Sequence, residues 1–95
     1  MLASLLAIPV RSWLGLDRGT TNRDYLVGLL DSGTLDQTAR TVVPDARAQA
    51  IAAQCLKGQA AAYLASGNPY LLQEANRDTP TILALRFMSA CGLVS

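Results

Sequence analysis

The sequence predicts an all-α protein, a compact bundle of four to five helices with a short apolar N-terminal segment. Hydrophobic residues make up 51% of the 95 positions but aromatic residues only 5%, so alanine and leucine supply most of the interior. These two residues lose the least free energy on entering a helix, whereas strands favour β-branched and aromatic residues. No linker, repeat or low-complexity stretch is visible, so we expect one helical domain over residues 1–95.

Residues 1–16 form the apolar N-terminal segment. They carry one cation, Arg11, among eight large apolar side chains: Leu2, Leu5, Leu6, Ile8, Val10, Trp13, Leu14 and Leu16. Pro9 interrupts any helix here, which predicts two short turns, the second around Trp13. The run is shorter than the roughly 20 residues that cross a bilayer and lacks the preceding cations of a secretory signal. We expect it to pack on the bundle or on a partner.

Two helices are expected next. Residues 21–24 and residues 34–37 each match the capping-box pattern, in which a threonine is followed three residues later by an acidic or amide residue. Gly33 stands where a left-handed C-terminal cap is expected, and Pro44 ends the second helix. Their apolar stripes are Tyr25, Leu26, Leu29 and Leu30 in the first, and Leu35, Ala39, Val42 and Val43 in the second.

The longest helix is expected over residues 45–66, where no proline occurs. Its polar stripe consists of Arg47, Gln54 and Lys57, and the rest of its surface is apolar, including Ile51, Cys55, Leu56 and Tyr63. A helix that is apolar over so wide an arc is predicted to be central in the bundle.

Two further helices follow. Residues 70–77 predict a short helix that folds back on the long one as a helical hairpin. Thr79 and Pro80 predict the cap and first position of a last helix that ends at Gly92. Only Arg86 interrupts its apolar character, so this helix is expected to be core, with a dimer interface as the alternative.

The composition argues against metal chemistry. The chain has no histidine, and its two cysteines, Cys55 and Cys91, lie far apart, whereas structural zinc needs about four Cys or His ligands. We expect both cysteines to be small buried hydrophobes, with a disulfide only in an oxidising compartment. The loop over residues 31–36 has too few oxygen ligands for calcium.

The sequence also predicts that the protein is not an enzyme and binds no cofactor. Without histidine, a Ser-His-Asp or Cys-His nucleophile cannot form, and Lys57 is the only lysine. Asp31 and Asp36 flank a turn, where caps or solvent account for both carboxylates. No glycine-rich phosphate loop is present. The net charge of +1 is too small for nucleic-acid binding to be expected.

These exclusions favour a small protein–protein interaction module in the cytoplasm that acts as an adaptor, an inhibitor or a structural subunit. The expected partner is another protein or a second copy of the chain. The alternative is a peripheral membrane protein that inserts residues 2–16 among lipid headgroups. The candidate partner-binding residues are Leu5, Leu6, Trp13, Leu14, Arg47, Gln54, Lys57, Tyr70 and Phe87. The aromatic residues and Leu14 are expected to anchor the interface, because aromatic side chains carry much of the binding energy.

Overall fold

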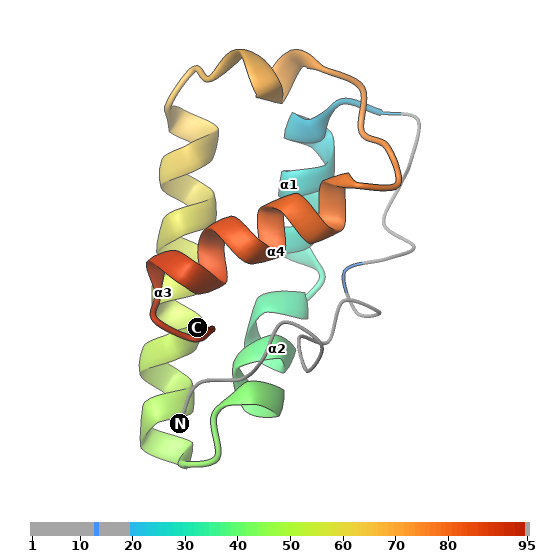
Figure 1. The fold of residues 1–95 in the computed structure, drawn as a ribbon. Helices are drawn as coiled ribbons and strands as arrows, with labels where there is room; N and C mark the ends of the chain where they lie inside the picture. Colours follow the sequence, from blue (N-terminus) through green and yellow to red (C-terminus); the bar gives the residue numbers. More distant parts are fainter. Residues whose placement is uncertain (1–12, 14–19, 95) are drawn as a thin grey trace.

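The computed structural model describes Trp13 and residues 20–94. Over these residues the chain forms four α-helices and one short 3-10 helix, which confirms the predicted all-α class (Figure 1). The elements are α1 (Asn22–Asp31), α2 (Thr34–Val42), α3 (Ala46–Ala65), η3 (Pro69–Leu72) and α4 (Thr79–Ala90).

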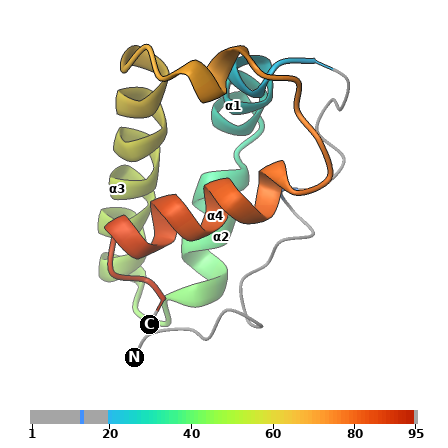
Figure 2. The same ribbon diagram turned by 45° about the horizontal axis from the view of Figure 1, so that its top comes forward.

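Three of the four α-helices form two antiparallel columns, and the fourth, α4, lies across both columns. α1 and α2 follow one another down one side, and α3 returns along the other side (Figure 1). α4 crosses both columns, as Figure 2 shows from a second direction. The main core lies beneath α4 and includes Tyr25, Leu26, Leu29, Leu35, Leu56, Leu83, Phe87 and Met88.

The start of α1 follows the predicted cap, but the start of α2 does not. The Thr21 hydroxyl accepts a hydrogen bond from the Asp24 backbone N–H at 3.2 Å. Gly33 has a φ of 76°, the left-handed conformation expected after α1. It also precedes α2 directly, so Thr34 is the first residue of that helix and not its cap. The Thr34 hydroxyl lies 2.6 Å from the Ser32 hydroxyl instead.

α3 is the longest helix, as predicted, but it is not buried on all sides. Its cap is Asp45, whose carboxylate accepts a hydrogen bond from the Ala48 backbone N–H at 2.8 Å. One face is buried, through Ala52, Ala53, Leu56, Ala60 and Tyr63. On another face, the Ile51 side chain is 67% exposed. α3 packs against α1, α2 and α4, which agrees with the predicted central position. Part of its apolar arc stays exposed because much of that arc is alanine, which loses little free energy when it stays in water.

The short helix predicted over residues 70–77 is present only at its start, as η3, and the predicted helical hairpin was wrong. η3 ends at Leu72, and Gln73 is extended. The backbone then pairs with the chain ahead of α1: the Asn22 N–H donates to the Gln73 carbonyl at 2.8 Å, and the Ala75 N–H donates to the Thr20 carbonyl at 2.6 Å. These bonds satisfy backbone groups that a continuing helix would have paired internally.

A buried polar cluster joins α1, η3 and α4. Asn22 is 1% exposed. Its side-chain amide donates to the Tyr70 carbonyl at 2.9 Å and accepts from the Thr79 hydroxyl at 2.9 Å. The Thr79 oxygen accepts from the Asn76 backbone N–H at 3.0 Å. The N-cap of α4 is Asp78, and Thr79 is the first residue of the helix. The Thr79 side chain is thus part of the polar cluster and is not the N-cap that the sequence predicted.

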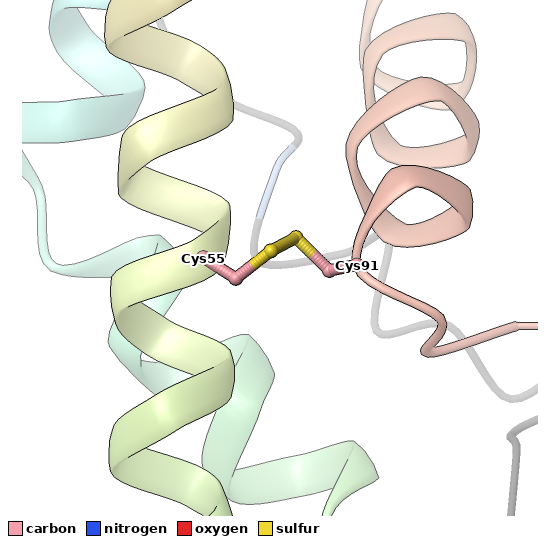
Figure 3. Close-up of a disulfide and its surroundings, with 2 residues drawn as sticks. All are labelled: Cys55 and Cys91. Carbon is pink, nitrogen blue, oxygen red and sulfur yellow. A yellow bond between two sulfur atoms is a disulfide. The ribbon is translucent and has the colours of Figure 1, made fainter.

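A disulfide joins Cys55 in α3 to Cys91 at the end of α4 (Figure 3). The expectation of two separate buried thiols was therefore wrong. The two residues are 36 positions apart in sequence, but α4 crosses α3 where their Cα atoms lie 6.0 Å apart. That separation is within the usual range for a disulfide. Both residues are half-buried.

Candidate functional site: an apolar groove beside the disulfide

Two of the predicted interface anchors, Trp13 and Phe87, are core residues of this chain. Trp13 is 0% exposed and Phe87 is 1% exposed. The Trp13 indole N–H donates to the Thr38 hydroxyl at 2.9 Å, and the Tyr25 hydroxyl donates to the Trp13 carbonyl. The Phe87 ring meets the Tyr63 ring edge-on, with centroids 6.1 Å apart. In this conformation neither anchor is accessible to a partner.

The other predicted apolar contacts have different positions. Leu5, Leu6 and Leu14 lie outside the described residues. Tyr70 is half-buried and packs against the core. Its hydroxyl is buried, and within the described part of the chain it has no hydrogen-bond partner.

Replacing Tyr70 with phenylalanine is expected to leave the free energy of unfolding unchanged or to raise it by up to about 1 kcal/mol. A buried hydroxyl without a partner has lost its bonds to water, a cost that phenylalanine avoids. Urea denaturation of both proteins measures the difference. A loss of more than about 1 kcal/mol would show that the hydroxyl has a stabilising partner.

The predicted polar stripe of α3 is exposed, but one of its members is paired within the chain. Arg47 and Gln54 are exposed. The Lys57 ammonium lies 2.8 Å from the Asp36 carboxylate of α2. A partly exposed pair of this kind contributes up to about 1 kcal/mol. The charge of Lys57 is therefore paired within the chain. Arg47 is the other cation of this stripe, and its side chain is exposed to solvent.

Among the described residues, an apolar groove of about 480 Å³ lies on the surface beside the disulfide. Three segments line it: the turn between α2 and α3, the first half of α3, and the residues after α4. Its lining residues are Val43, Pro44, Asp45, Ala48, Ile51, Ala52, Cys55, Cys91, Gly92 and Leu93. Figure 3 shows how the disulfide bridges the space between α3 and the end of α4.

Local sequence signals shape both walls of this groove. Gly92 has a φ of 68°, a conformation that favours glycine, and it turns the chain back after α4. The Leu93 N–H then donates to the Met88 carbonyl at 2.8 Å, which fixes the position of Leu93 in the groove. On the other wall, the Gln49 side-chain amide donates to the Val43 carbonyl at 2.7 Å and holds the turn before α3.

The groove is apolar, and among the described residues that line it one has a charged side chain. That residue is Asp45, whose carboxylate already caps α3. Ile51 contributes the most exposed apolar surface. Three smaller hollows among the described residues are about 170 to 220 Å³ in volume and are lined in part by charged side chains, such as Asp36 and Arg40 in one of them.

The groove was not predicted from the sequence, because Ile51 was expected in a buried arc and the two cysteines were expected to be unpaired. Pairing Cys55 with Cys91 would have been the signal, since that pairing brings Leu93 close to α3. Six of the nine predicted contact residues belong to the described part of the chain, and none of these six lines the groove. Their role in binding a partner stays a prediction.

Within Trp13 and residues 20–94, no three potential metal-ligating side chains gather in one place. Across the same residues, every helix is too short or too polar to cross a membrane. No family model, curated protein or solved structure matches this chain.

Proposed function

We propose that this protein is a small, non-catalytic interaction module that binds an apolar peptide segment of another protein in the groove beside the disulfide. The observation that carries the proposal is the 67% exposure of Ile51 within an apolar groove of about 480 Å³. Recognition sites for small ligands and side chains are commonly about 300 to 1,000 Å³ in volume and mostly apolar. The groove therefore has room for a few aliphatic side chains.

The physical basis of binding is burial of apolar surface on walls that are already in place. Covering Ile51 alone removes enough apolar area from water to contribute about 1 to 2 kcal/mol. The disulfide and the Gln49–Val43 hydrogen bond hold the walls before a partner arrives. Such preorganisation raises affinity, because little conformational entropy is lost on binding.

The charge of the groove favours one class of segment. Asp45 is the one charged side chain among its lining residues. A bound segment with acidic side chains would be repelled by this carboxylate, whereas a basic side chain at the rim would be attracted. The proposed partner segment is therefore aliphatic, free of acidic residues, and basic at one end.

The proposal places the protein in an oxidising compartment instead of the cytoplasm that the sequence suggested. Disulfides form and persist in such compartments and are rare in the cytosol. The Cys55–Cys91 bond supports this location. The burial of Trp13 argues against the membrane alternative, because an indole that is 0% exposed is not free to insert among lipid headgroups.

Peptide selection with the intact chain as bait tests the proposed function. A display library of random short peptides is expected to yield sequences rich in Leu, Ile and Val and poor in Asp and Glu. We expect Ile51→Asp to weaken the affinity for a selected peptide by at least about tenfold, which corresponds to about 1.4 kcal/mol. Fluorescence anisotropy with a labelled peptide measures the dissociation constant.

The matched control is Leu72→Asp. Leu72 is 78% exposed on η3 and is not among the groove residues, so the same chemical change there should leave the affinity unchanged. Equal losses in the two variants, or a library that yields no aliphatic sequences, would contradict the proposal. Light scattering on the same samples shows whether the partner is a second copy: a dimer that Ile51→Asp dissociates would identify self-association through the groove.

A further inference from the structure

We infer that the groove is controlled by the redox state of the Cys55–Cys91 disulfide. A segment bound in the groove protects this bond from dithiol reductants, and reduction of the bond releases the segment. The inference rests on the proposed function, because it takes the groove as a site for apolar segments. It makes the disulfide a switch for partner release.

The disulfide lies in the wall of the groove and not in the main core. Both half-cystines are among the groove residues, and both are half-buried. Cys55 follows Ile51 by four positions in α3, so the two side chains are neighbours on one face of the helix. The Ile51 side chain is 67% exposed. A segment that packs on Ile51 therefore lies within one helical turn of the disulfide and covers it.

The wall opposite α3 is a short stretch of chain after α4, which includes the groove residues Cys91, Gly92 and Leu93. The Leu93 N–H donates to the Met88 carbonyl at 2.8 Å, which fixes the shape of this stretch relative to α4. The disulfide is its covalent link to α3 (Figure 3). Leu93 also packs on alanine side chains of α2 and α3, each of which offers little apolar area.

Reduction is expected to loosen this wall while the bundle stays folded. Leu83, Phe87 and Met88 of α4 are at most 1% exposed and belong to the main core, so they hold α4 in place in either redox state. The change is confined to the stretch after α4, which is then free to move away from α3. A groove whose walls are no longer held in place binds a segment more weakly, because binding must then order them.

The reductant is a dithiol, and the exchange balances in two steps. One thiolate of the dithiol attacks a sulfur of the Cys55–Cys91 bond, which breaks and leaves the other cysteine as a thiolate that takes up a proton. The second thiol of the reductant then displaces the remaining cysteine and closes the reductant's own disulfide. Two electrons and two protons pass from the dithiol to the cysteines. The attack needs access to a sulfur, which a bound segment blocks.

Protection and release follow from one coupling free energy. If the oxidised chain binds the segment more tightly than the reduced chain by a given factor, the bound segment shifts the equilibrium between disulfide and thiols by the same factor towards the disulfide. The segment is therefore held where disulfides persist and released where dithiols reduce them.

The rate of reduction in the intact chain tests this inference. Oxidised protein is mixed with dithiothreitol, with and without a peptide selected from the display library, and alkylated thiols are counted by mass spectrometry. At a peptide concentration ten times the dissociation constant, about one molecule in eleven has an empty groove, so reduction should be about tenfold slower. An unchanged rate would overturn the inference.

Two variants and a denaturant series are the controls. The peptide should slow reduction in Leu72→Asp, which leaves the groove residues intact, and should protect Ile51→Asp much less. Without peptide, reduction through the groove should be insensitive to low urea concentrations. A rate that rises with urea in step with the unfolding equilibrium would place the attack in the unfolded chain and overturn the inference.

The affinity in the two redox states is the second measurement. Fluorescence anisotropy should show at least about fivefold weaker binding to the reduced chain than to the oxidised chain, at a temperature where circular dichroism shows both to be folded. Equal affinities would overturn the inference while leaving the groove as the peptide site. Failure of the proposed function gives a different result, because Ile51→Asp would then not weaken peptide binding to the oxidised chain.

Discussion

Replacing Trp13 with alanine is expected to lower the free energy of unfolding by about 3 to 5 kcal/mol. The indole is fully buried, and its N–H donates to Thr38, so truncation leaves a large cavity and removes a buried hydrogen bond. A small domain typically has a stability of about 5 to 15 kcal/mol, so this loss is a large fraction of the total. Urea denaturation followed by circular dichroism measures it.

The control for this variant is Trp13→Phe. It keeps an aromatic ring in the core but removes the indole N–H. Thr38 still donates its hydroxyl to the Thr34 carbonyl at 2.8 Å, so the loss should be smaller than for alanine. A loss below about 1 kcal/mol in Trp13→Ala would contradict the assignment of Trp13 to the core.

The second large effect is expected when Cys55 and Cys91 are both replaced by serine. In the chain-entropy model, a crosslink between residues 36 positions apart contributes about 3 to 4 kcal/mol to stability. Denaturation with and without a thiol reductant measures this contribution. The reduced wild-type protein should unfold near the midpoint of the double variant, and the reductant should not affect the variant.

The disulfide also holds one end of the groove, because both half-cystines line it. The double variant should therefore bind a selected peptide more weakly than the wild-type protein at a temperature where both are folded. Equal denaturation midpoints for the oxidised and reduced wild-type protein would contradict the structural role assigned to this bond.

The helices were predictable where the signals are local. Thr21 and Gly33 mark the two ends of α1, and the absence of proline after Asp45 marks α3. The segment after η3 was not predictable, because its backbone pairs with Thr20 and Asn22 from the far end of the chain. No local pattern in residues 70–77 indicates that their backbone hydrogen-bond partners lie about 50 positions away in the sequence.

The candidate site was less predictable than the helices. Aromatic residues were expected at an interface, but Trp13 and Phe87 lie in the main core, where Trp13 is bonded to Thr38 and Tyr25 and Phe87 packs on Tyr63. The groove is assembled from the α2–α3 turn, α3 and the residues after α4. Its existence depends on where α4 crosses α3, which the disulfide fixes and which helical periodicity does not encode.

Two of the exposed apolar surfaces of the described residues can be told apart by experiment. One is the groove around Ile51. The other is the outer face of α4, where Ile82 is 47% exposed and Leu85 is 37% exposed. These two side chains stand three positions apart on α4, and neither is among the lining residues of the groove. Isolated exposed hydrophobic residues of this kind are common on protein surfaces.

The most direct test of the central claim is a methyl NMR titration of the full-length chain, labelled at Ile, Leu and Val, with a selected peptide. We expect the methyl signals of Val43, Ile51 and Leu93 to shift on binding, because all three line the groove. The signals of Leu72 and Ile82 should stay in place. Shifts centred on Ile82 and Leu85, with Ile51 unmoved, would contradict the account and place the interface on α4.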